Sequence, residues 1–212
     1  MPRLILPSPR ARLVIATAAI ALFALLATMP AAVIACDQQL ATAMRTGVPP
    51  AVLQAAFAIT QLGNFETLVA IGLIVAVWLA IRRQWFDLGL WLAVTLGNGL
   101  LNRALKLAFA RVRPLHDHGL VIEPAYSFPS GHASGSVAVY GLLTLLLLPR
   151  LPAPWRRPLL LATVTLILLI GTSRVILQVH FLSDVIAGYA SATALLLSCI
   201  AIGERLRQRP VS

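Results

Sequence analysis

The chain has 212 residues, of which 59% are hydrophobic and 11% are charged, and its formal net charge is +10. Soluble domains carry about 25% charged residues, so this chain lacks the polar surface that a soluble protein of its length needs. The apolar residues gather instead into long runs of the kind found in membrane proteins. The basic residues stand in small groups at the ends of these runs, with no stripe interleaved with aromatic residues, which argues against a nucleic-acid partner.

Six apolar stretches predict an all-α, polytopic membrane protein, with six transmembrane helices in one bundle and a single domain over residues 1–212. The predicted spans cover residues 13–35, 67–81, 88–108, 132–148, 159–173 and 184–202. Only the first contains the roughly 20 apolar residues of a full span, so the others should extend into their polar flanks. The apolar segment 52–63 is predicted to be an interfacial helix. The proline-rich segment 149–158 predicts a tight turn between the fourth and fifth spans.

The distribution of arginine predicts the orientation in the membrane. One set of alternate loops, together with both termini, carries most of these residues: Arg3, Arg10, Arg12, Arg82, Arg83, Arg150, Arg156, Arg157, Arg205, Arg207 and Arg209. Because cytoplasmic loops are enriched in Lys and Arg, both termini are expected in the cytoplasm of a bacterial cell. The loops on the other side of this inner membrane would then face the periplasm or the exterior.

The N-terminal segment permits a second interpretation, because a basic start, an apolar run and Val33-Ile34-Ala35-Cys36 resemble a lipoprotein signal with its cleavage cysteine. A signal core has about 7–15 apolar residues, and this run is longer, which favours a retained helix. Cleavage would leave five spans. The other cysteine, Cys199, lies well inside the last apolar run, so a disulfide with Cys36 is not expected.

Three short polar stretches stand out in this hydrocarbon-rich chain, and all fall on one predicted face of the membrane. They read KLAFARVRP at Lys106–Pro114, PSGH at Pro129–His132 and SRVILQVHFLSD at Ser173–Asp184. A cluster of cations beside a bilayer is costly, so its presence needs a reason. Bound phosphate supplies such a reason.

The first stretch offers two cations, Lys106 and Arg113, whose spacing of seven residues places them on one face if the third helix persists. The guanidinium of Arg113 can bind two phosphate oxygens, while Lys106 acts as a point charge. On their own, both residues would be interpreted as ordinary cations at a membrane end.

The second stretch immediately precedes the fourth apolar helix. Ser130 suits an N-cap and Gly131 allows close approach of the backbone, so the free N–H groups of the helix start form an anion site beside His132. On its own, the stretch could equally be a plain loop-to-helix transition with a capping serine.

The third stretch places His180 and Asp184 at i and i+4, at the start of the sixth helix, where the two side chains share one face. A carboxylate bonded to one ring nitrogen fixes the tautomer and leaves the other nitrogen free to attack. The alternative is an acid that satisfies the helix dipole beside an incidental histidine. Since the three stretches are chemically complementary, together they predict a phosphoryl-transfer site.

These segments resemble the three signatures of the type 2 phosphatidic acid phosphatase superfamily, the lipid phosphate phosphatases. The signatures are K-x6-R-P, P-S-G-H and S-R-x5-H-x3-D, and every fixed position matches in the family's order. Tyr126-Ser127-Phe128 before PSGH also resembles the bacterial branch. The resemblance implies that His180 is the nucleophile, Asp184 its orienting partner and His132 the general acid. It implies that the phosphate is bound by Lys106, Arg113, Ser130, Gly131 and Arg174.

The resulting hypothesis is a phosphatase of lipid phosphates or diphosphates that works through a phosphohistidine, without metal or cofactor, and with a bell-shaped pH profile. Phosphatidylglycerol phosphate, phosphatidic acid and a polyprenyl diphosphate all fit as substrates. His116-Asp117-His118 could suggest a metal cluster but is interpreted as a solvated loop. The alternatives are a lipid-to-lipid phosphotransferase, a vanadate haloperoxidase and a non-catalytic transporter or scaffold. The oligomeric state does not follow from the sequence.

Overall fold

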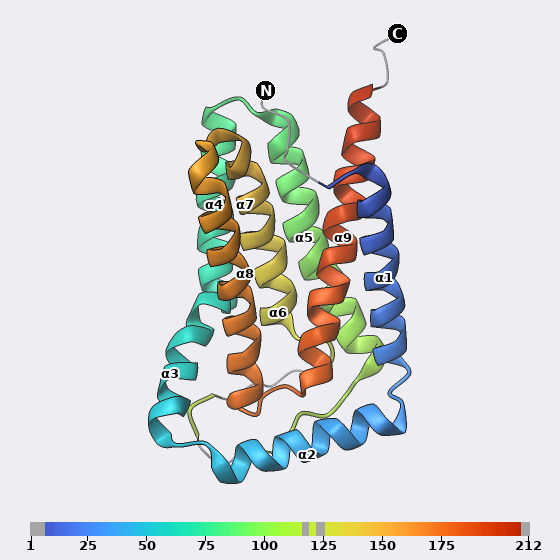
Figure 1. Cartoon of the computed structure of the whole chain (residues 1–212), viewed down its shortest axis with the longest axis vertical. Helices are drawn as coiled ribbons and strands as arrows, with labels where there is room; N and C mark the ends of the chain where they lie inside the picture. Colours follow the sequence, from blue (N-terminus) through green and yellow to red (C-terminus); the bar gives the residue numbers. More distant parts are fainter. Residues whose placement is uncertain (1–6, 116–118, 122–125, 209–212) are drawn as a thin grey trace.

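The computed structural model describes residues 7–115, 119–121 and 126–208, and the elements in these ranges are all helical (Figure 1). The longer helices run roughly along one axis, and one helix, α2, lies across an end of the bundle. The α-helices are α1 (Pro9–Ala27), α2 (Ala31–Gly47), α3 (Pro50–Thr60), α4 (Phe65–Ile81), α5 (Trp85–Phe109), α6 (Gly131–Ser136), α7 (Leu142–Leu147), α8 (Ala153–Ile176) and α9 (Leu182–Gln208). Three short elements join some of them: η1 (Gln61–Gly63), the π-helical η2 (Val137–Gly141) and η3 (Leu148–Arg150).

The predicted first span, residues 13–35, is wrong at its C-terminal end. It divides into α1 and α2, because Met29 adopts a left-handed conformation with φ of 47° and Pro30 stands at the N-cap of the next helix. A proline cannot continue an α-helix without loss of a backbone hydrogen bond and a steric clash. The chain therefore turns at this point, and α2 runs across the end of the bundle instead of through it (Figure 1).

Within the described residues, five helical segments are long and apolar enough to cross a membrane: Pro9–Ala27, Pro50–Ile81, Gly131–Arg150, Ala153–Ile176 and Leu182–Arg207. The predicted third span forms α5, which has 25 residues but is not among the five. Its second half carries Asn98, Asn102, Arg103 and Lys106, and these residues lower its apolar character. The all-helical membrane fold is thus confirmed, whereas the number of six spans is not.

Two further boundaries differ from the prediction. The interfacial helix expected over 52–63 forms α3 and η1, and together with α4 it makes one long apolar segment. The turn expected over 149–158 is shorter, because α8 already begins at Ala153 and includes Pro158. Pro154 stands in the first turn, where the backbone N–H groups have no intrahelical partner, whereas Pro158 lies inside the helix and leaves one backbone hydrogen bond unmade.

The largest apolar core lies between α4, α5, α7, α9 and the π-helical segment. Its central member is Trp91, which is 1% exposed and donates from Nε1 to the carbonyl of Gly72 at 3.0 Å. The other buried members are Val75, Leu79, Leu90, Val94, Ala138, Val139, Leu142, Leu146, Leu196 and Ile200. The outward faces of the helices carry large exposed hydrophobic residues such as Leu96 and Leu161, as expected where lipid surrounds a bundle.

The two ends of the bundle are polar. At the end opposite α2, where α1 begins and α9 ends (Figure 1), Arg12 pairs with Glu204 at 2.7 Å. Nearby, the carboxylate of Asp87 pairs with Arg150 at 3.3 Å and with Arg207 at 3.2 Å. At the α2 end, the buried polar side chains belong to the predicted motifs and their neighbours.

Candidate active site

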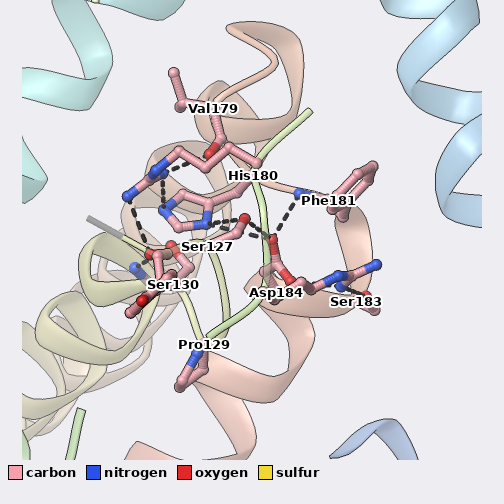
Figure 2. A network of polar contacts seen from close by, with 12 residues as sticks. Ser127, Pro129, Ser130, Val179, His180, Phe181, Ser183 and Asp184 are labelled. Carbon is pink, nitrogen blue, oxygen red and sulfur yellow. Dashed lines mark hydrogen bonds and ion pairs between the residues drawn. The ribbon is translucent and has the colours of Figure 1, made fainter. Parts of the chain in front are cut away.

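The three motif stretches converge at the end of the bundle that α2 crosses. The first continues from the C-terminal end of α5, the second forms the start of α6, and the third runs from the last turns of α8 into α9. Figure 2 shows Ser127, Ser130, His180 and Asp184 close together at this point. His180 is 2% exposed and Asp184 is fully buried, so the centre of this cluster is shielded from solvent.

His180 and Asp184 are in contact as predicted, although not on one helix face. Nδ1 of His180 lies 3.4 Å from Oδ2 of Asp184, while α9 begins only at Leu182, so the contact forms across the turn that enters the helix. The same carboxylate oxygen accepts hydrogen bonds from the backbone N–H of Phe181 at 2.9 Å and from the hydroxyl of Ser127. These donors fix the carboxylate, which in turn fixes the imidazole.

The tautomer of His180 follows from its second neighbour. Nη1 of Arg113 lies 3.1 Å from Nε2 of His180. A guanidinium group has only donors, so Nε2 must accept, and the ring proton sits on Nδ1 facing Asp184. Nε2 therefore carries an available electron pair.

The electrostatic surroundings keep this imidazole neutral. Burial, together with the positive charges of Arg113 and Arg174, lowers the pKa of His180 to about 4, although the hydrogen bond and the charge of Asp184 raise it. At neutral pH the His180 ring is thus uncharged and can act as a nucleophile.

The two cations of the first motif lie close together, as predicted, but for a different structural reason. The helix α5 ends at Phe109, and Ala110 follows in a left-handed conformation with φ of 44°, so Lys106 and Arg113 do not share a helix face. Instead both donate to the carbonyl of Tyr126, Lys106 from Nζ and Arg113 from Nη2 at 3.2 Å. The loop carbonyl brings the two charges together.

The start of α6 is built as predicted. Ser130 is the N-cap, and its Oγ accepts from the backbone N–H of Ala133 at 3.4 Å. The backbone N–H of Ser130 donates to the carbonyl of Asp184 at 3.0 Å, which ties α6 to α9. A side chain at Gly188 would place its Cβ 2.6 Å from the carbonyl oxygen of Ser130, so glycine is needed for this close approach. At Gly131 a Cβ would lie 3.3 Å from Oδ1 of Asn102.

Arg174 and His132 lie on a cavity of about 370 Å³, which is also bordered by Thr60, Gln61, Asn64 and Glu66. Arg174 is 1% exposed and donates from Nη1 to Oγ1 of Thr60 at 2.8 Å. His132 is half-buried, and its Nε2 lies 2.7 Å from Oδ1 of Asn64. The imidazole of His132 is within electrostatic reach of His180 and of three motif cations, Lys106, Arg113 and Arg174.

A set of polar residues behind His180 was not identified from the sequence. Arg111 donates from Nη1 to Oδ1 of Asp184 at 2.6 Å and from Nη2 to Oδ2 of Asp37 at 2.8 Å. The backbone N–H of Ser183 donates to Oδ1 of Asp37 at 3.0 Å. Asp37 is 3% exposed and belongs to α2, so the transverse helix supports the carboxylate that orients the nucleophile.

The sequence held weak signals for these residues. Arg111 stands at a variable position of the first motif, which gave no reason to separate it from the other cations. Asp37 is an acid next to a long apolar run, and a carboxylate in such a place requires a partner. Ser127 lies in the stretch that was noted only for its resemblance to the bacterial branch.

Among residues 7–115, 119–121 and 126–208, no group of three His, Cys, Asp or Glu side chains could hold a metal ion. The segment His116-Asp117-His118 lies outside the described residues, so its predicted role as a solvated loop stays a prediction. Both cysteines are free thiols.

Comparison with known protein families identifies the superfamily to which the chain belongs. Residues 85–208 match the model of the PAP2 superfamily. The chain belongs to this superfamily, and the resemblance seen in its motifs is confirmed. The matched region contains all three motifs but not Asp37 or Asn64, which come from the N-terminal third of the chain.

The similar proteins are membrane-lipid phosphatases by name. Phosphatidylglycerophosphatase B of Bacillus subtilis (strain 168) is 32% identical over 153 residues, which are 71% of this chain and 74% of that protein. Lipid A 1-phosphatase of Rhizobium johnstonii is 32% identical over 120 residues, which are 52% of this chain and 45% of that protein.

Two solved structures share the fold. The transmembrane PAP2-type phosphatidylglycerolphosphate phosphatase from Bacillus subtilis matches with a TM-score of 0.81 and 30% identity, over 92% of this chain and 98% of that one. LpxE of Aquifex aeolicus matches with a TM-score of 0.57 and 20% identity, over 79% and 94% of the two chains, a likeness of fold alone. Together with the five apolar helices, the match to a transmembrane relative identifies the chain as an integral membrane protein.

Proposed function

We propose that this protein is a membrane phosphatase that removes the phosphate of a lipid phosphate or diphosphate through a phosphohistidine on His180. The observation that carries the proposal is the state of Nε2 of His180. It is unprotonated, belongs to a buried neutral ring, and lies beside a guanidinium that could bind the phosphate oxygens. The families of the similar proteins support the same reaction class.

In the first step Nε2 of His180 attacks phosphorus, and the bond from phosphorus to the leaving oxygen breaks. Nη1 of Arg113, which donates to Nε2 of His180, transfers its hydrogen bond to a phosphate oxygen. His132 gives its proton to the leaving oxygen, so that the lipid departs as a neutral alcohol or a protonated phosphate. Asp184 stabilises the positive charge that develops on the ring of His180.

In the second step water attacks phosphorus from the side that the leaving group has vacated. His132, now neutral, takes a proton from this water, and the bond between phosphorus and Nε2 breaks to release inorganic phosphate and regenerate His180. Two displacements at phosphorus replace a single difficult one. The cycle restores both imidazoles to their starting protonation states.

The charge on the phosphate oxygens is offset by three cations and by the N–H groups at the start of α6. Lys106, Arg113 and Arg174 supply the positive charge, while Ser130 and Gly131 place the helix start beside the phosphate. We propose that these donors suffice and that no metal ion takes part. Full activity after EDTA treatment would support this, and a loss reversed by added Mg²⁺ would contradict it.

The substrate is proposed to be a lipid because the site lies at one end of an apolar bundle. An acyl or prenyl tail can stay in the membrane while its phosphate enters between the helix ends. Two similar proteins, phosphatidylglycerophosphatase B and lipid A 1-phosphatase, are named for lipid phosphates, which supports a lipid phosphate as substrate. Phosphatidylglycerol phosphate, phosphatidic acid and polyprenyl diphosphate are the candidates.

We also propose that α5 is a sixth span and that the whole chain works as one domain. Six passes would explain why α1 begins and α9 ends at the same end of the bundle (Figure 1). That end carries Arg150 and Arg207, and by the positive-inside rule it would face the cytoplasm, with the site facing the periplasm or exterior.

The proposal is tested by measuring inorganic phosphate released from the three candidate lipids in detergent micelles. His180→Ala serves as the inactive control. Release by the wild-type chain, but not by the variant, is expected. Transfer of the phosphate to a second lipid without release would identify a phosphotransferase, and an absence of both would refute the enzyme assignment.

A further inference from the structure

An apolar groove lies between the transverse helix α2 and the adjoining turns of α8 and α9 (Figure 1). Its volume is about 660 Å³, larger than the cavity of about 370 Å³ at His132. Among the described residues that line the groove, none is charged and two, Thr172 and Tyr189, carry a hydroxyl. The hydroxyl of Tyr189 already donates to the carbonyl of Ile167 at 2.7 Å. Because ordered water needs several polar partners, hydrocarbon is the filling that suits this groove.

The groove is continuous with the lipid-facing surface of α8. Leu161, Val164 and Leu168 are exposed, and their spacing of three and four residues places them in one stripe along this helix. Leu168 and, four residues further on, Thr172 also line the groove. Since α8 is long and apolar enough to cross a membrane, an acyl chain that lies along the stripe leads directly into the groove.

The groove is separate from the catalytic cavity. No described residue lines both of them. On the side of the site the groove ends at Val175 and Val185, which are buried and pack with the buried Ala133. Since no described cation lines the groove, it offers nothing that would bind a phosphate. The chain that fills it therefore belongs to a lipid other than the one whose phosphate is bound at His180.

An acyl chain in this groove would contact the helix that carries Asp37. Leu40 and Met44 of α2 line the groove and are only partly buried, whereas Asp37 is the one buried residue of this helix. No buried apolar side chain holds α2 to the bundle, and hydrocarbon packed against Leu40 and Met44 would supply van der Waals contacts. Because Asp37 pairs with Arg111, which pairs with Asp184, the position of α2 affects the catalytic carboxylate.

We infer that this groove binds an acyl chain of a membrane phospholipid that is not the substrate, and that the bound chain holds α2 in place and so raises turnover. The lining carries no charge among the described residues, so the site recognises the chain and not the headgroup. The effect on turnover rests on the proposed function, whereas the binding site does not.

Gly47 offers a variant that obstructs the groove without disturbing the fold. It is the exposed last residue of α2, it lines the groove, and a Cβ at this position meets nothing within 4 Å. Gly47→Leu should therefore fold normally and occupy space that the acyl chain needs. Gly99→Leu is the matched control, because Gly99 is exposed on α5, lines neither cavity and also has nothing within 4 Å of its Cβ.

Binding is measured with a phosphatidylcholine that carries a photoreactive diazirine in its acyl chain. The protein is kept in cholate, a detergent without an acyl chain of its own. Mass spectrometry should locate crosslinks on Leu40, Met44 or Ile186 in the wild type and in Gly99→Leu, and about fivefold fewer in Gly47→Leu, where the added side chain overpacks the groove. Equal labelling in all three proteins, or no labelling of the groove, would overturn the site whether or not the protein is a phosphatase.

The effect on turnover is measured as phosphate released from a short-chain phosphatidic acid in cholate, while long-chain phosphatidylcholine is added. Phosphatidylcholine has no phosphomonoester and so does not compete as a substrate. Release by the wild type should rise about five- to tenfold and saturate. Gly47→Leu should keep the basal rate but need about fivefold more phosphatidylcholine for half of the effect, whereas Gly99→Leu should behave as the wild type.

Three other results would count against the inference in different ways. Equal activation of Gly47→Leu and Gly99→Leu would show that the lipid acts elsewhere, and crosslinking without activation would overturn the role in turnover. No activation by phosphatidylcholine, with a preference for long-chain substrate that Gly47→Leu abolishes, would assign the groove to the substrate's own tail. No release from any lipid by the wild type would overturn the proposed function, while the crosslinks would still decide the binding site.

Discussion

The two imidazoles of the site are held in different ways. His180 is 2% exposed and is bonded to the carboxylate of Asp184, which has Arg111 and then Asp37 behind it. His132 is half-buried, borders a cavity and is bonded to the neutral carboxamide of Asn64. His180 therefore has a charged partner and is shielded from solvent, whereas His132 has a neutral partner and faces a cavity.

This difference matches the two chemical tasks. A nucleophile that forms a covalent intermediate gains positive charge, and a fixed carboxylate stabilises that charge without reorganisation. A general acid must give its proton away and later accept another, which a neutral partner hinders less than a carboxylate would. The acid must also reach the leaving group, so it cannot be buried as deeply as the nucleophile.

The largest expected effect separates the two histidines. His180→Ala should abolish turnover of every substrate, because the proposed phosphoenzyme forms on the Nε2 atom of this residue. His132→Ala should lower the rate on an alkyl lipid phosphate by about 10²–10⁴-fold, and an aryl phosphate should recover only the part of this loss that belongs to the first step, since its leaving group needs no proton but the water still lacks its base. Phosphate release measures both, and more than a few per cent activity in His180→Ala would remove it as the nucleophile.

The second prediction concerns the carboxylate that orients His180. Asp184→Asn should lower kcat by about 10³–10⁴-fold, because an amide has only one acceptor oxygen and cannot accept both from Arg111 and from the imidazole, Ser127 and Phe181. Asp87→Asn is the matched control, since Asp87 is also a buried aspartate in an ion-pair cluster but lies at the other end of the bundle. Equal losses in both variants would indicate that Asp184 acts only through stability.

The third prediction tests the next layer behind the nucleophile. Asp37→Asn leaves Arg111 bound to Asp184 but removes the carboxylate that holds its other nitrogen. We expect kcat to fall about ten- to hundredfold with KM little changed, as for a group that positions a catalytic residue without touching substrate. A change in KM alone, or unchanged kinetics, would contradict the role of α2 in positioning Asp184.

The contrast also shows what could be predicted from the sequence. His180, Asp184 and His132 were identified because their spacing and residue types match a known motif. Their convergence at one end of the bundle follows because successive spans run in opposite directions. The end of the third predicted span, the start of the fourth and the loop between the fifth and sixth then lie on the same side of the membrane. The supporting residues Asp37 and Asn64 could not be found in this way, because each contacts its partner across a large separation in sequence and neither has a characteristic spacing.

The fold, like the site, could be predicted only in part from the sequence. Apolar runs gave the helical membrane class, since hydropathy reports burial in lipid. They did not give the break at Met29-Pro30, because the apolar run continues through it while the backbone turns. Nor did they show that α5 differs from its neighbours, where the polar residue Asn98 lies inside the bundle, 6% exposed and bonded to Ser134.

A smaller effect is expected where the two imidazole-bearing segments meet. Gly188→Ala would push a methyl group to 2.6 Å from the carbonyl of Ser130 and so displace the start of α6 from α9. We expect about tenfold lower activity and a loss of about 1–3 kcal/mol in stability, as for overpacking elsewhere. Gly72→Ala in α4, where nothing lies within 4 Å, should keep full activity.

The smallest effect near neutrality is expected in the pH dependence of kcat/KM, which reports the protonation of His180. Because burial lowers the pKa of His180 to about 4, the ring stays neutral as the pH falls, and only about a tenth is protonated at pH 5. Protonation removes the electron pair of Nε2, so kcat/KM should fall only as the pH passes through about 4. The substrate's own ionisation near pH 6 is titrated separately. His132→Ala assayed with an aryl phosphate should keep this acid limb, because the limb belongs to His180. An acid limb near pH 6.5 would show that His180 is solvated in the working enzyme, and the contrast between the two imidazoles would not hold.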